Sequence, residues 1–198
     1  MEAGLKLTEN ASTSSTTDQK NDPAGSDAAK SDAIKTALYG AISDIGEDNI
    51  ASLLRHGASH DVINTLTSNV KEHLKVPQSG YDALTLATAT LHYILTVSLI
   101  PSQRKIDCRG IAVDIAIPDL KTLMTDPRQA LIIQIINHKT VPDMSSLQPY
   151  KKNIWLISPH QIAGYRTFVI GANFADIILA IQDFLEGTGS SSLKILRV

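Results

Sequence analysis

Apolar positions in the first half of the chain repeat at helical spacing. From Ile34 they fall on one helical stripe that continues to Ile45, and Gly46 breaks the pattern. The same spacing predicts three more helices, over residues 49–55, 61–75 and 81–98. Ser59 is the expected N-cap of the third helix, because its side-chain oxygen can accept a bond from an unpaired helical N–H.

The pattern changes after Pro101 to short apolar runs that are typical of strands. "KIDCRG" and "IAVDIAIPD" predict two strands with a tight connection at Arg109–Gly110. Three further runs, "ALIIQII", "NIWLIS" and "RTFVIG", predict three more strands. The first of these is apolar on both faces, as is usual for a central strand that is covered on both sides. A closing helix is expected over residues 173–185.

This order predicts an α/β or α+β fold, with a helical N-terminal part followed by a central mixed β-sheet of about five strands and a C-terminal helix. Residues 1–31 are polar and small, which predicts a disordered tail. A single globular domain is expected over residues 32–186, with a helical part at 32–80 and an α/β core at 81–186. Residues 187–198 are expected to form a flexible tail with a short strand-like segment, "SLKILRV".

The C-terminal segment leaves two alternatives open. Leu193, Ile195 and Leu196 would suit a strand added to a sheet edge, either in this chain or in a second copy, which would give a homodimer. The other alternative is an unstructured tail.

Composition bears on whether the protein spans a membrane, forms disulfides or carries a secretion signal. Leu84–Ile100 is the most apolar segment, but at 17 residues, with four Thr and one His, it is shorter than the roughly 20 residues that a bilayer requires. We therefore expect a buried helix and no membrane partner. Cys108 is the only cysteine, which excludes an internal disulfide and a Cys-rich zinc site. The N-terminus has no apolar signal segment, so a cytoplasmic location is expected.

Charge gives a weak indication of a nucleic-acid partner. The formal net charge is −2, yet residues 100–152 contain eight basic and five acidic side chains. The candidate phosphate contacts are Arg104, Lys105, Arg109, Lys151 and Lys152. Tyr150, Trp155 and Tyr165 are the aromatic side chains nearby that suit base stacking. An ordinary solvated rim explains these charges equally well.

Two polar residues interrupt the predicted strands. Alternation places Asp114 on one face of the second strand with Ala112 and Ala116, and Val113, Ile115 and Ile117 on the other. Gln134 lies in the middle of the third strand. If these strands are neighbours, Asp114 and Gln134 lie side by side, where the carboxylate requires a cation or hydrogen-bond donors.

This arrangement resembles the restriction-endonuclease-like nucleases, whose motif is written PD-(D/E)xK. In that family an Asp on the second strand and an acid-x-Lys on the next strand hold a divalent metal that activates water. The resemblance implies that Asp114 is a metal ligand and catalytic residue, and that Gln134 lies at the position of the second acid. Ile136 occupies the position of the Lys, so Lys139 or Arg128 would have to replace it.

The departures from the motif lead to two functional hypotheses. The first is a non-catalytic or catalytically degenerate nuclease-like domain that acts as a binding or assembly module for nucleic acid or a protein partner. The second is an active nuclease that uses Mg²⁺ at Asp114, with Gln134 and Lys139 completing the site. A purely structural Asp114–Gln134 pair, in which Gln134 donates to the carboxylate, is the alternative without either function.

Overall fold

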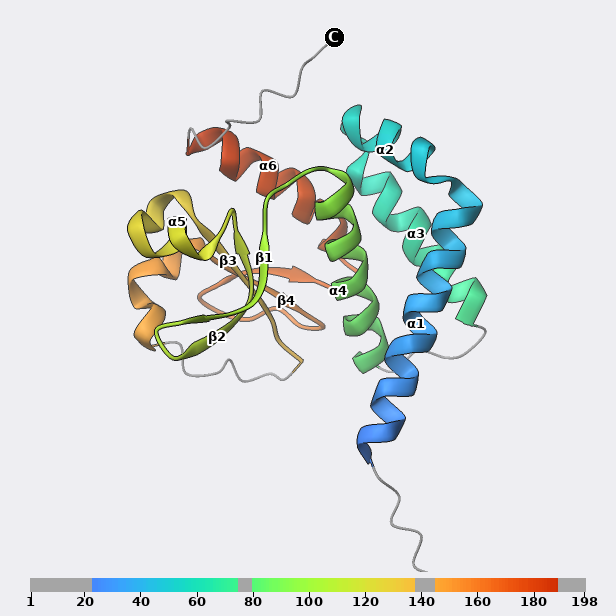
Figure 1. The fold of residues 1–198 in the computed structure, drawn as a ribbon, viewed down its shortest axis with the longest axis horizontal. Helices are drawn as coiled ribbons and strands as arrows, with labels where there is room; N and C mark the ends of the chain where they lie inside the picture. The colour runs from blue at the N-terminus through green and yellow to red at the C-terminus, as the bar shows by residue number, and fades with distance from the viewer. Residues whose placement is uncertain (1–22, 75–79, 138–144, 189–198) are drawn as a thin grey trace, which may run out of the picture.

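A five-stranded sheet lies between a layer of long helices and a layer of short ones in the computed structural model of the chain (Figure 1). The structure describes residues 23–74, 80–137 and 145–188. The expected order of helices, mixed sheet and C-terminal helix is confirmed. In the described part of the chain, no helix combines the length and apolarity that crossing a bilayer requires.

The N-terminal half forms the predicted helices. Their bounds are α1 Pro23–Ile45, α2 Glu47–Arg55, α3 Ser59–Leu74 and α4 Gly80–Val97. Helix α1 begins inside the stretch that composition assigned to the tail, since a proline suits the first helical position and the following alanines favour helix. Residues 1–22 and the "SLKILRV" segment lie outside the described residues.

Ser59 does not cap α3, contrary to the sequence prediction. It lies within the first turn, because the amide of Val62 already donates to the carbonyl oxygen of Ala58 at 3.1 Å. The Ser59 side chain is buried, and its hydroxyl has no hydrogen-bond partner among the described residues. The chain therefore turns into the helix one residue earlier than the cap preference indicated.

The strands follow one another across the sheet in the order of the sequence. They are β1 Gln103–Cys108, β2 Ile111–Ile117, β3 Leu131–Ile135, β4 Ile154–Ser158 and β5 Arg166–Val169. The first three pair antiparallel, and β3, β4 and β5 pair parallel. Arg109 and Gly110 join β1 to β2 with φ values of 58° and 79°, the left-handed geometry of a two-residue hairpin turn.

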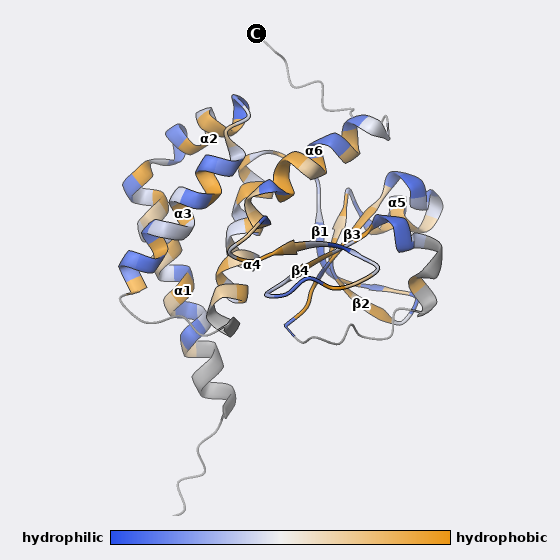
Figure 2. Cartoon of the chain, turned by 180° about the vertical axis from the view of Figure 1, so that it is seen from behind, coloured by the Kyte–Doolittle hydropathy of each residue, from blue (hydrophilic) through white to orange (hydrophobic). Residues whose placement is uncertain are grey.

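Each face of the sheet has its own hydrophobic cluster. The helical face packs against α1, α3 and α4 and against α6 (Ile177–Gly187), and includes Ile115, Ile133 and Ile157. This cluster contains residues of both the helical part and the sheet. Figure 2 shows apolar residues concentrated on the strands and on the inward sides of these helices.

The opposite face, called here the thin face, has a lighter cover. It packs against α5 (Leu120–Thr125) and the 3₁₀ helix η2 (Ser145–Asn153) through Leu123, Leu147 and Tyr150. Its strand residues include Val113, Ala116 and Ile132, and Ile136 joins this cluster directly after the end of β3.

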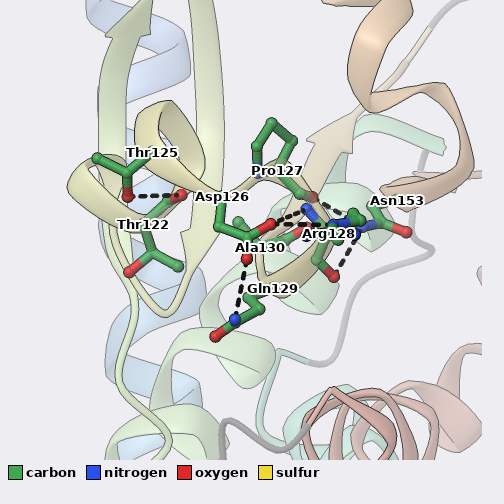
Figure 3. A network of polar contacts seen from close by, with 8 residues as sticks. All are labelled: Thr122, Thr125, Asp126, Pro127, Arg128, Gln129, Ala130 and Asn153. Atoms are coloured by element: carbon green, nitrogen blue, oxygen red, sulfur yellow. Dashed lines mark hydrogen bonds and ion pairs between the residues drawn. The ribbon is translucent and has the colours of Figure 1, made fainter.

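Side-chain amides close two irregular parts of the sheet. At the start of β3, the Asn153 amide donates to the carbonyl oxygens of Pro127 and Ala130 at 3.0 and 3.1 Å, which holds the loop that enters the strand (Figure 3). At the outer edge of β5, the Asn173 amide accepts from the Val169 N–H at 2.6 Å and donates to the Thr167 oxygen at 3.4 Å. Asn173 thus takes the place of a neighbouring strand on that edge.

Candidate functional site: the fork between β2 and β3

Strands β2 and β3 separate beside Asp114 and Gln134. The last backbone pair on this side is Ile115 with Ile133. We call the next stretch, formed by Ala112, Asp114, Gln134 and Ile135, the fork. The sequence prediction that Asp114 and Gln134 lie side by side on neighbouring strands is thereby confirmed.

The two polar side chains bridge the fork by bonding to the backbone. The Gln134 Oε1 accepts from the Asp114 N–H at 2.8 Å, and its Nε2 donates to the Ala112 oxygen at 2.8 Å. The Asp114 Oδ2 accepts from the Ile135 N–H at 2.8 Å. Gln134 therefore pairs with the backbone of Asp114. The structural alternative assumed that Gln134 donates to the Asp114 carboxylate, and that detail is wrong.

A distortion in β1 faces the fork from the other side. Lys105 has a φ of 49°. The ladder between β1 and β2 pairs the residues before and after Lys105 with β2, but Lys105 and Asp114, which would face each other, are not paired. The strict alternation predicted for β2 is wrong at this point. Val113 packs on the thin face with Ala116, whereas Ile115 packs on the helical face. The sequence pattern shows no sign of this interruption.

Burial dominates the electrostatics of the fork. Desolvation raises the pKa of Asp114, while the hydrogen bond from the Ile135 N–H and the positive charge of Lys105 act in the opposite direction. Gln134 is buried, with 5% of its surface exposed. The fork thus holds one partly buried carboxyl group with a reduced tendency to ionise.

Of the positions that would supply the catalytic charges, those that the structure describes bring no charge to the fork. Ile136, at the Lys position of the motif, is buried in the thin-face cluster. Arg128 lies before β3, where its Nε is 3.3 Å from Asp126 Oδ1 and its side chain is 91% exposed (Figure 3). Lys139 lies outside the described residues. The Pro118–Asp119 pair is also separate from the fork, because Asp119 caps α5 by accepting from the Thr122 N–H at 2.6 Å.

The donor set of the fork does not fit a Mg²⁺ ion. Mg²⁺ prefers several oxygen ligands in octahedral geometry, usually with more than one negative charge nearby. Here the Gln134 Oε1 already accepts the Asp114 N–H, which leaves a single carboxylate. No cluster of three or more His, Cys, Asp or Glu side chains suited to a metal occurs in the described part of the chain.

The five candidate basic residues are exposed and fall into two groups by their contacts. Arg104 and Lys105 lie near His92 of α4, where both charges help to lower the pKa of its imidazole. Arg109 and Lys151 lie over tyrosine rings on the thin-face side. Their distances to the ring centroids are 5.7 Å for Tyr150 and 6.0 Å for Tyr165. Lys152 follows at the end of η2.

Two of the proposed stacking residues are too deeply buried to stack against a base. Tyr150 and Trp155 are buried, with 2% and 3% of their surfaces exposed. Arg166, which the sequence analysis did not single out, covers Trp155 with its guanidinium carbon 4.2 Å from the ring centroid. Its position one residue after Tyr165 carries no signal of this contact, which arises because β5 pairs beside β4.

His92 is a further polar residue of uncommon environment. Burial, followed by the charges of Arg104 and Lys105, lowers its pKa to about 4. Its Nε2 is buried and has no hydrogen-bond partner among the described residues.

Comparison with known proteins does not assign this arrangement to a family. The chain matches no protein-family model, no curated protein and no solved structure.

Proposed function

We propose that this chain is a catalytically degenerate nuclease-like domain that acts as a binding or assembly module, with nucleic acid as its partner. The order of α4, the β1–β2 hairpin and β3 agrees with the order of elements in the restriction-endonuclease-like family. Asp114 and Gln134 meet on adjacent strands, as the two acidic positions of that motif do.

One observation carries the non-catalytic part of the proposal. Both hydrogen-bonding ends of the Gln134 amide are taken by the backbone of β2. An amide so used holds two diverging strands together, and it brings no negative charge to a metal, while its oxygen already accepts a hydrogen bond. Ile136 adds an apolar side chain where a nuclease places its lysine.

The binding surface we propose lies on the thin-face side, around Arg109, Lys151 and Lys152. All three side chains are exposed, and the contacts of Arg109 and Lys151 with tyrosine rings hold the two cations near the surface of the fold. Clustered cations bind phosphates with little dependence on sequence.

An active nuclease that uses Asp114 is the second candidate. It is favoured by the partial exposure of Asp114 and by the fact that only Oδ2 of its carboxylate takes part in the bond to Ile135. In that case Asp114 would act as the metal ligand.

A paired assay of cleavage and binding tests both candidates. Wild type and Asp114→Asn are incubated with single- and double-stranded DNA and RNA in Mg²⁺ or Mn²⁺, and binding is followed by fluorescence anisotropy. We expect no cleavage and salt-dependent binding. Metal-dependent cleavage that Asp114→Asn abolishes would establish the second candidate instead.

A matched pair of variants locates the binding surface. The double change Lys151→Gln, Lys152→Gln should weaken binding about tenfold at low salt and reduce the salt dependence by about two released ions. The control Lys30→Gln, Lys35→Gln removes the same charge from exposed positions of α1 and should bind as wild type does. Equal weakening by both variants would show that total charge alone is responsible. Absence of binding by the wild type would reject nucleic acid as the partner.

A further inference from the structure

A cleft separate from the fork opens between α3, α4 and the segment that joins β5 to α6. Its volume is about 430 Å³, within the size range of small-molecule sites. None of its described lining residues belongs to β1, β2 or β3. The fork and the basic residues of the thin face therefore do not contribute to it.

The inner wall of the cleft is apolar. Leu86 of α4 and Phe174 of the 3₁₀ helix η3 (Phe174–Asp176) line it and are buried. The space exists because neighbouring positions have little or no side chain, as at Ala87 and Gly171. Interiors are normally filled to crystal-like density, so a recess with such small residues leaves room for another molecule.

The outer wall is polar and comes from a single helix. Asn64, Thr67, Ser68 and Lys71 line the cleft at spacings that place them on one face of α3. The amide nitrogen of Asn64 is 3.1 Å from the His60 Nδ1, a contact that fixes this amide at one end of the row. Along this face of α3, the hydroxyl groups of Thr67 and Ser68 lie between the amide of Asn64 and the ammonium group of Lys71.

The cleft has a positive charge, which comes from Lys71. Lys71 is the only ionisable side chain among its described lining residues, and no carboxylate forms an ion pair with Lys71 in the described part of the chain. A cation beside hydroxyl donors and an apolar wall suits a ligand with one anionic end and one apolar end.

We propose that this cleft binds a small organic anion with an apolar body, of the class of medium-chain carboxylates. The carboxylate lies against Lys71 and the hydroxyls of Thr67 and Ser68. The hydrocarbon part lies along Leu86 and Phe174. This site is independent of the function proposed for the fork and the basic residues.

Three eight-carbon probes of different charge test the site. Octanoate, octanol and octylammonium are titrated into the full chain, and amide shifts of Ser68 and Ala172 are followed by two-dimensional NMR. We expect octanoate to bind about fivefold more tightly than octylammonium, with shifts at both amides. Lys71→Gln should weaken octanoate binding about fivefold, and Lys71→Glu should reverse the preference in favour of octylammonium.

Lys121→Gln is the matched control, because Lys121 is also exposed but lies in α5, on the opposite side of the sheet. It should bind octanoate as wild type does, and unchanged spectra elsewhere would show that each variant is folded. Equal affinity for all three probes would mean an apolar groove without charge selection and would overturn the proposal. No binding of octanoate, shifts confined to other regions, or equal losses in Lys71→Gln and Lys121→Gln would overturn it as well.

Discussion

The two faces of the sheet differ in the elements that cover them and in the polar groups at their margins. The helical face packs against long helices through the larger apolar cluster. The thin face is covered by short segments and has the polar fork at its margin, where Gln134 and Asp114 complete the backbone pairing. The difference indicates that an interruption in the ladder can be tolerated where side chains replace the lost bonds.

The largest expected effect compares one leucine in each cluster. Leu91 of α4 and Leu147 of η2 are both fully buried. Leu91→Ala should cost about 3–5 kcal/mol, because long packed helices cannot close the resulting cavity. Leu147→Ala should cost about 2–3 kcal/mol, because the short cover can move inward. Urea unfolding measures both, and equal losses would show that the two covers are equally rigid.

Lowering the pH should reduce the free energy of unfolding, because His92 of α4 has a lowered pKa in the folded protein. Its pKa falls from 6.5 to about 4 on folding, so the unfolded chain binds the extra proton first as pH decreases. The stability present above pH 6.5 is therefore lost progressively between about pH 6.5 and 4. Allowing for the partial exposure of the ring, we expect a loss of about 1–3 kcal/mol in wild type relative to His92→Gln. Identical pH profiles of the two proteins in urea unfolding would contradict this.

Removing the amide of the fork should cost about 2–3 kcal/mol. Gln134→Leu keeps a buried side chain of similar size but leaves the Asp114 N–H and the Ala112 oxygen without their partners. Hydrogen exchange should then accelerate at Asp114 and Ile135 more than at Ile157 on β4, which serves as the internal control. A uniform acceleration would indicate global destabilisation without local opening.

Two substitutions of Asp114 separate its charge from its hydrogen bond. Because burial raises the folded pKa, this group contributes most stability below its unfolded pKa, and the contribution is lost as pH rises through the folded pKa. At pH 7, Asp114→Asn should thus be as stable as wild type or up to about 1 kcal/mol more stable. Asp114→Ala should lose about 1–2 kcal/mol, because the Ile135 N–H loses its acceptor. A destabilised Asp114→Asn would show that the negative charge itself is required.

The smallest expected effect lies where the helical layer joins the sheet. Leu99 lies two residues after the end of α4, with a φ of 54°, and is 73% exposed. Leu99→Gly should raise the thermal midpoint, with a gain of about 1 kcal/mol, because glycine adopts this conformation without steric cost. Leu99→Ala keeps the strain and is the control. An equal gain from both variants would attribute the effect to the exposed leucine and not to the backbone.

The sequence by itself determined the elements and the neighbourhood of the candidate site. Helical spacing from Ile34 onward and the β-branched runs from Ile111 to Ile157 define the secondary structure, because periodic burial is a local property of the chain. The adjacent placement of Asp114 and Gln134 was predicted on the condition that their strands are neighbours, and the pairing of β2 with β3 meets that condition. Departures from the motif at Gln134 and Ile136 were also visible in the sequence.

Only the tertiary structure decided what these residues do. The distortion at Lys105 and the failure of alternation at Val113 depend on how β1 and β2 pair across the sheet, which no local pattern encodes. Likewise, the bonds of Gln134 to the β2 backbone exist because two strands diverge at that point. The cleft beside Lys71 results from segments far apart in the chain that meet around small residues. Contacts of this kind depend on three-dimensional packing, because the partners that satisfy a buried polar group come from different elements.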